Sequence, residues 1–194
     1  MSKSISKRFV ILAASAILLQ PAARAGHVTA TADILFSGSS TLHDFEGKAS
    51  LQPFVASFTE DQETGGLQVT AQASLNIEDM TTENNKRDKN MFKMFDLEHF
   101  QLITGELPET AIRSEGSTQT RLHLRIRNVE HDVDATISNL QRNGNQISCS
   151  MTFPVSLKLF DLKGPSVMGL IRVDDLIDVE CRITGQIEET VTGR

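Results

Sequence analysis

The sequence contains no Trp and no Tyr, and ten Phe supply all of its large aromatic side chains apart from His. Any apolar cavity is therefore expected to be lined by aliphatic side chains and Phe. The apolar run FVILAASAILL, residues 9–19, has eleven residues, whereas a membrane-spanning helix needs ~20. No later segment is apolar enough to anchor the chain, so we expect no stable membrane insertion.

Motifs of several enzyme classes are also missing. The Ser-rich stretch SGSSTLHD, residues 37–44, contains no Gly-x-Ser-x-Gly nucleophile elbow, and no phosphate-binding loop with its Lys occurs. Two dense His and carboxylate clusters, His43-Asp44 and Glu130–Asp134, lack regular metal-ligand spacing. We therefore predict a protein that is not an enzyme, with no metal and no cofactor. The alternative is a metal-dependent enzyme that uses His43 and His131.

The first 25 residues have the features of a secretory signal peptide. Basic residues at the start (Lys3, Lys7 and Arg8) precede the apolar run, and the small residues Ala23 and Ala25 suit signal peptidase. We therefore expect residues 1–25 to be removed and residues 26–194 to form one mature domain. The expected location is the periplasm or the exterior of a bacterial cell.

The mature chain is predicted to be strongly acidic. Removing residues 1–25 takes away four basic residues and leaves 15 Lys and Arg against 25 Asp and Glu, a net charge of −10. Such a surface repels phosphate backbones and anionic lipid head groups. Nucleic acid is therefore excluded as a partner, whereas assembly into a homo-oligomer remains open.

Alternation of apolar and polar residues indicates β-strands along most of the chain. In Leu67–Ile77, every odd position is apolar and every position between is polar, which is typical of a strand with one buried face. We predict eight strands, in 28–36, 44–58, 67–77, 100–107, 122–126, 133–137, 147–159 and 177–183. Turn sequences such as ETGG and RNGN favour antiparallel neighbours. A sheet closed into a barrel would bury one face of every strand and leave no exposed edge.

One stretch, ENNKRDKNMFKMFD at 83–96, does not alternate. On a helical wheel Met91, Met94 and Phe95 fall on one side, opposite the Lys residues. This predicts a single amphipathic helix, capped by Thr82 or Asn84, whose apolar face covers an open barrel end. Its role could be core packing or the gating of a ligand.

Four stretches together resemble the bacterial YceI-like family of exported proteins. They are FSGSSTLHDFEGKA (36–49), NKRDKNMFKMFDLEHFQLITGEL (85–107), LRIRNVEHDVDATI (124–137) and VMGLIRVDDLIDVECRITGQI (167–187). They occur in the family's order and cover almost all of the mature chain. The resemblance implies an all-β, eight-stranded antiparallel lipocalin-like barrel with one helix. It also implies that a polyisoprenoid or similar amphiphilic lipid lies inside.

The predicted site follows from the apolar phase of the strands and the helix. Small residues in that phase leave room for a hydrocarbon tail. The expected lining residues are Leu67, Val69, Ala71, Ala73, Leu75, Ile77, Met91, Met94, Phe95, Phe153, Val155, Leu157, Ile177, Val179 and Ile183. Head-group contacts are expected from His43, Arg87 or Asp88, although Arg87 and Asp88 could instead pair with a neighbouring strand. The alternative to a lipid carrier, besides the metal enzyme, is an interaction module with a filled barrel.

The two cysteines, Cys149 and Cys181, are predicted to face inward on neighbouring strands. A symmetric hairpin centred near Pro165 would place them directly opposite each other. An oxidising compartment permits a disulfide, but directly opposed strand positions are slightly wide for a relaxed bridge. Both a disulfide and two buried free thiols therefore stay open.

Overall fold

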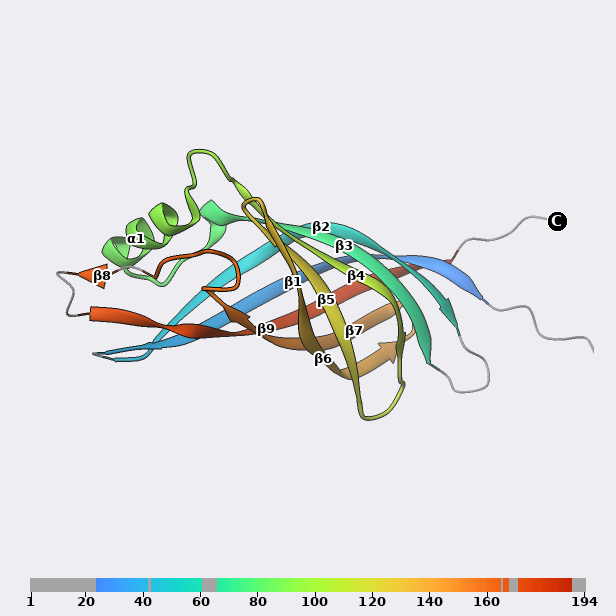
Figure 1. Cartoon of the computed structure of the whole chain (residues 1–194). Helices are drawn as coiled ribbons and strands as arrows, with labels where there is room; N and C mark the ends of the chain where they lie inside the picture. The colour runs from blue at the N-terminus through green and yellow to red at the C-terminus, as the bar shows by residue number, and fades with distance from the viewer. Residues whose placement is uncertain (1–23, 42, 61–65, 165, 168–170, 190–194) are drawn as a thin grey trace, which may run out of the picture.

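Eight long antiparallel strands form the body of the molecule (Figure 1). The computed structural model describes residues 24–41, 43–60, 66–164, 166–167 and 171–189. The strands are β1 (Ala25–Ser40), β2 (Phe45–Glu60), β3 (Leu67–Asn76), β4 (Leu102–Ile112), β5 (Ser117–Ile126), β6 (Val129–Asn143), β7 (Gln146–Ser156) and β9 (Ile171–Glu189), with β8 (Ser166–Val167) a two-residue addition beside β9. Each strand from β1 to β6 pairs with the next, β7 pairs with β9, and β9 pairs with β1. This closure confirms the predicted eight-stranded antiparallel barrel.

The alternation in the sequence corresponds to the two faces of the barrel wall. In β1 every even residue from Gly26 to Phe36 is buried, and the residues between them are exposed. Along β3 the odd positions point inward, with Leu67 and Leu75 buried and the smaller residues between them half-buried. Burying one face of each strand therefore places the apolar core inside the barrel.

The one α-helix of the described residues lies at one end of the barrel (Figure 1). Helix α1 (Asn85–Phe95) begins at Asn84, whose side chain accepts hydrogen bonds from the backbone amides of Lys86 and Arg87. It ends at Asp96, which has the left-handed conformation with φ of 54°. This confirms the predicted amphipathic helix and identifies Asn84, rather than Thr82, as its N-cap. A short 3₁₀ helix, η1 (Ile77–Asp79), follows β3 directly.

The region between β7 and β9 differs from the prediction. The expected strand reached Leu159, but β7 ends at Ser156. The Asp175 carboxylate accepts hydrogen bonds from the Ser156 hydroxyl and the Lys158 amide at 2.9 and 2.8 Å, which holds the chain in a turn. The pairing of β7 with β9 is centred on position 166 and not on Pro165, a residue outside the described part of the chain.

This shift changes the partners of both cysteines. Cys149 lies opposite Ile183, and Cys181 lies opposite Met151. Both cysteines are free thiols in the structure. The predicted direct opposition was therefore wrong by two residues in register, because the pairing of β7 with β9 is centred one residue further along the chain than the prediction assumed.

The predicted signal peptide, residues 1–25, falls almost entirely outside the described residues, which begin at Arg24. Its prediction is therefore not tested by the structure. Within the described ranges, no helix is long and apolar enough to cross a membrane.

Candidate functional site

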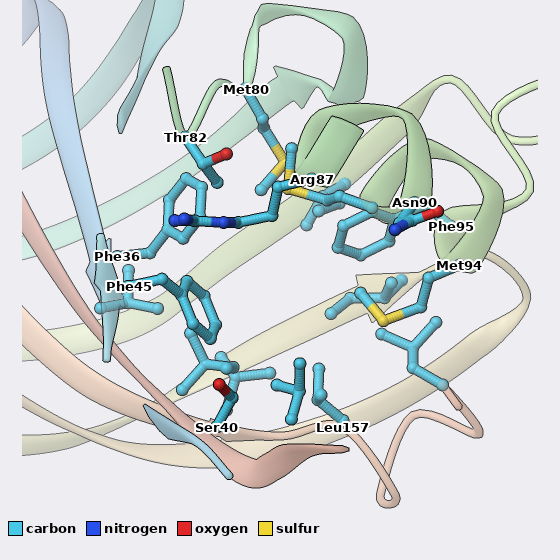
Figure 2. Close-up of a pocket in the computed structure, with 18 of the residues that line it drawn as sticks. Phe36, Ser40, Phe45, Met80, Thr82, Arg87, Asn90, Met94, Phe95 and Leu157 are labelled. Carbon is cyan, nitrogen blue, oxygen red and sulfur yellow. The ribbon is translucent and has the colours of Figure 1, made fainter. Parts of the chain in front are cut away.

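A cavity of about 500 Å³ lies between α1 and the adjoining end of the barrel (Figure 2). The helix contributes Met91, Met94 and Phe95, and the strands contribute a wall of aliphatic and Phe side chains. The apolar lining consists of Ile34, Phe36, Phe45, Met80, Met91, Met94, Phe95, Ile103, Leu124, Ile126, Phe153, Val155, Leu157, Leu162, Val173, Ile177 and Val179. We call this space the outer cavity.

A second, smaller cavity of about 180 Å³ lies within the barrel. It shares Ile34, Ile103 and Leu124 with the outer cavity, so the two spaces adjoin at these side chains. Its lining includes Ala71 and Ala73, whose short side chains leave the space open. We call it the inner cavity.

Most of the predicted lining residues border one of these cavities. The outer cavity is bordered by Met91, Met94, Phe95, Phe153, Val155, Leu157, Ile177 and Val179. The inner cavity is bordered by Leu67, Val69, Ala71, Ala73, Leu75 and Ile183. Ile77 borders neither, because it begins η1 and is fully buried in the core, with an exposed fraction of 0%.

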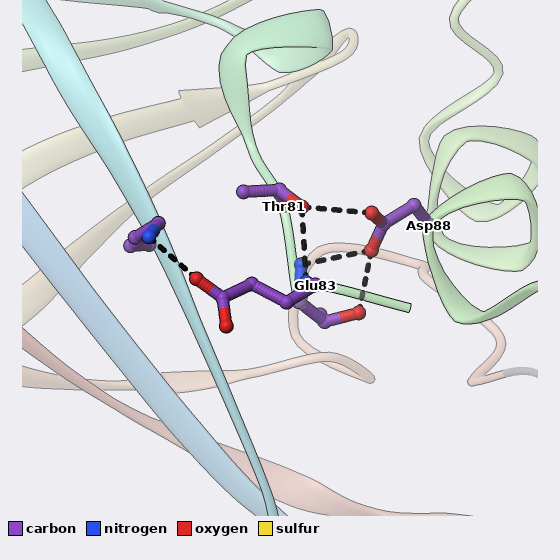
Figure 3. A network of polar contacts seen from close by, with 5 residues as sticks. Thr81, Glu83 and Asp88 are labelled. Carbon is purple, nitrogen blue, oxygen red and sulfur yellow. Dashed lines mark hydrogen bonds and ion pairs between the residues drawn. The ribbon is translucent and has the colours of Figure 1, made fainter. Parts of the chain in front are cut away.

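The three residues predicted to contact a head group do not all lie at the outer cavity. His43 and Arg87 border the outer cavity, whereas Asp88 does not. The Asp88 carboxylate accepts hydrogen bonds from the Thr82 amide at 2.8 Å, the Thr82 hydroxyl at 2.5 Å and the Thr81 hydroxyl at 2.9 Å (Figure 3). Asp88 therefore has a structural role, which is a set of hydrogen bonds rather than the ion pair with a strand that was the predicted alternative.

Electrostatics agree with an ionised Asp88. Burial alone would raise the pKa of this carboxyl, but the hydrogen bonds from Thr82 and Thr81 and the charge of Arg87 hold it below its usual range. The carboxylate therefore joins the start of the helix to the segment before it.

The same segment is attached to β2. The Lys48 amide donates to the Thr81 carbonyl at 2.8 Å, and the Thr81 amide donates to the Lys48 carbonyl at 2.9 Å. The Lys48 ammonium also contacts Glu83 at 2.5 Å (Figure 3), but both side chains are exposed, so this ion pair contributes little. The backbone bridge and Asp88 together hold α1 over the barrel end.

Arg87 extends from the helix into the outer cavity (Figure 2). Its Cζ atom lies 5.6 Å from the centre of the Phe45 ring, within the range of a cation–π contact. Sequence reasoning did not identify Phe45 or its neighbour in the cavity wall, Phe36. A Cβ atom on Gly47 would lie 2.1 Å from the Phe36 ring, so the absence of a side chain at Gly47 allows this ring to approach the backbone of β2. The spacing of Phe and Gly in residues 36–49 is the feature of the sequence from which the role of these two rings could have been predicted.

The two histidines of the alternative metal site do not share a cavity. His43 is exposed at the border of the outer cavity. His131 lies in β6 and packs edge-to-face on Phe160 with ring centres 5.4 Å apart. Across the part of the chain that the structure describes, no group of three His, Cys, Asp or Glu side chains could hold a metal ion.

The thiols add no reactive group to the site. Cys149 and Cys181 both border the inner cavity. Burial raises the pKa of the Cys149 thiol to about 11. Burial, with the nearby Cys149 and Glu180, raises that of Cys181 to about 12. Since the thiolate is the nucleophile, both groups are inert near neutral pH.

Several solved structures share this fold. BcnA from Burkholderia cenocepacia has a TM-score of 0.64 at 14% identity, covering 79% of this chain and 95% of that chain. A polyisoprenoid binding domain from Saccharophagus degradans, implicated in plant cell wall breakdown, has a TM-score of 0.57 at 12% identity and covers 84% and 99%. The YceI protein of Campylobacter jejuni has a TM-score of 0.55 at 18% identity and covers 72% and 84%.

Comparison with curated proteins gives no match. The family model for the YceI-like domain matches residues 23–185, which is most of the chain and includes strands β1 to β7 and most of β9. The chain therefore belongs to the YceI-like family.

Proposed function

We propose that this protein binds a long-chain isoprenoid or a similar amphiphilic lipid inside its barrel and acts as a carrier or sequestering protein. The observation that carries the proposal is the outer cavity of about 500 Å³, which has an apolar wall and a polar border. Its volume lies within the ~300–1,000 Å³ common for ligand sites. An interaction module whose barrel is filled by side chains would not have a cavity of this size.

The chemistry of the wall favours a hydrocarbon tail. Burying one methylene group is worth ~0.8 kcal/mol. A tail with about ten buried methylenes would therefore gain roughly 8 kcal/mol before the costs of association. Tight binding then needs few polar contacts, in agreement with a lining in which apolar side chains outnumber polar ones.

The family relationship supports the same class of ligand, since the Saccharophagus degradans relative of this fold is described as a polyisoprenoid binding domain. Residues 1–25 have the pattern of a signal peptide, so we propose that the protein works in the periplasm or outside the cell. In this role it needs no cofactor and no catalytic residue.

Mass spectrometry of lipid extracted from the natively exported protein tests the proposal. Purification without detergent should retain close to one long-tailed lipid per chain, and an unrelated exported protein treated in the same way should retain only traces. A folded protein that carries no lipid and does not bind added isoprenoids would overturn the proposal. Stoichiometric zinc or iron would favour the metal-dependent alternative.

A further inference from the structure

The polar side chains of the outer cavity come from four neighbouring segments: the end of β1, the loop after it, the segment before α1, and α1 itself. Some of them are labelled in Figure 2. They are Ser40, His43, Thr82, Asn84, Lys86, Arg87 and Asn90. A ligand whose tail fills the apolar wall would place its head group among these side chains.

The charges at this border have one sign. Lys86 and Arg87 are cationic, and among the described residues that border the cavity there is no Asp or Glu. The whole chain, in contrast, has 25 acidic residues against 19 basic ones. A border without carboxylates in an acidic protein is a local reversal of charge, which favours an anion.

Within the described part of the chain no ion pair includes Lys86 or Arg87. The adjacent carboxylate, Asp88, is directed to Thr81 and Thr82 instead. Arg87 is half-buried against Phe45. Its planar guanidinium has five N–H donors in a geometry that suits a carboxylate or phosphate.

The helix terminus itself does not provide the anion site. The amides of Lys86 and Arg87 both donate to the Asn84 side chain at 3.1 Å, and the Asp88 amide donates to the Asn84 carbonyl at 2.9 Å. These donors are already satisfied. An anion at this border would therefore be bound by side chains, with Arg87 as its main partner.

We propose that the ligand carries an anionic oxygen head group, a carboxylate or a phosphate monoester, which Arg87 binds at the border of the outer cavity. This inference rests on the proposed function and specifies the chemistry of the ligand. A long-chain fatty acid and an isoprenyl phosphate both provide such a head group. Neutral alcohols and amides with the same tails do not.

Ligand pairs that differ only in the head group test this inference. Oleate is compared with oleyl alcohol, and geranylgeranyl phosphate with geranylgeraniol, by displacement of Nile red from the folded protein. The wild type should bind the anion of at least one pair about tenfold or more tightly than its neutral partner. The pair with the larger ratio identifies the source as a carboxylate or a phosphate.

Variants of Arg87 test whether this residue causes the preference for the anion. Arg87→Gln should reduce the anion-to-neutral ratio to near one, with a larger loss of affinity for the anion than for the alcohol, and Arg87→Lys should retain part of the ratio. Lys93→Gln is the matched control, because it removes the same charge from the exposed face of α1 without bordering the cavity. Equal binding of acid and alcohol by the wild type, or an equal loss of both ligands in Arg87→Gln, would overturn the inference. If no ligand displaces the dye, the lipid cavity itself is refuted and the inference falls with it.

Discussion

The inner cavity should determine how long a tail the barrel accepts. Ala71 and Ala73 border this space of about 180 Å³, and replacing both by Phe adds two phenyl rings to it. In the wild type, each methylene that passes Ile34, Ile103 and Leu124 into the inner cavity should add ~0.8 kcal/mol, or about fourfold in Kd. In the double variant these methylenes have no space.

The expected loss of affinity depends on the length of the ligand's hydrocarbon tail. If four methylenes are excluded, the loss is ~3 kcal/mol, which is on the order of 200-fold in Kd. Short-chain ligands that occupy only the outer cavity should bind both proteins equally. Calorimetry with a homologous series of unbranched ligands, from medium to long chains, should show affinity that rises with length in the wild type and levels off early in the variant.

Two controls are needed to attribute the effect of the double variant to the filled inner cavity. Filling a packed interior can cost ~1–3 kcal/mol, so the fold of the double variant must be checked by circular dichroism and thermal melting. Gln72 lies between the two alanines and points outward, and Gln72→Phe should leave the length dependence unchanged. A folded double variant that still gains affinity with every added methylene would show that the tail does not enter the inner cavity.

Three further outcomes follow from the local chemistry. Asp88→Ala should lower the free energy of unfolding by about 1–3 kcal/mol in urea at neutral pH, because two hydroxyls and an amide lose their charged acceptor. Since the pKa of Asp88 is depressed, this stabilisation is present above pH ~4 and is lost as the pH falls through the folded pKa, so variant and wild type should converge in acid. The hydrogen bond between His123 and Asp132 raises the pKa of His123; an NMR titration should place it above ~6.5, and Asp132→Asn should lower it. Stability from this pair is complete below pH ~6.5 and is lost as the pH rises through the folded pKa. Cys149 and Cys181 should resist thiol reagents in the folded protein but react fully in denaturant without reductant, and fewer than two reactive thiols per chain would contradict the free state.

The barrel was predictable because its strands have one buried face. The alternation of Leu67–Ile77 corresponds to the burial of β3, in which Leu67 and Leu75 are buried whereas Thr70 and Gln72 are exposed. The helix was predictable for a similar reason, because Met91 and Phe95 are spaced one turn apart and both are buried beneath a charged outer face. These features depend on local periodicity, which a single sequence contains.

The register between β7 and β9 was not predictable in the same way. It depends on Asp175 bonding to Ser156 and Lys158, a contact between residues far apart in the sequence. A long connection has many compatible registers, and inward-facing residues remain inward when the register shifts by two. The inward phase of Cys149 and Cys181 was therefore predicted correctly, while their opposition was not.

The border of the outer cavity shows why composition alone could not separate Arg87 from Asp88. Side by side in the sequence, the two opposite charges suggest one shared role, but consecutive residues on a helix point in different directions. Asp88 reaches back to Thr81 and Thr82, and Arg87 reaches over Phe45 into the cavity. Substitutions of the two residues should therefore have different effects. Asp88→Ala should reduce stability while keeping the preference for an acid over an alcohol, and Arg87→Gln should remove that preference while changing stability little. If both variants lose stability and preference together, the pair acts as one unit and the division of roles argued from the structure is wrong.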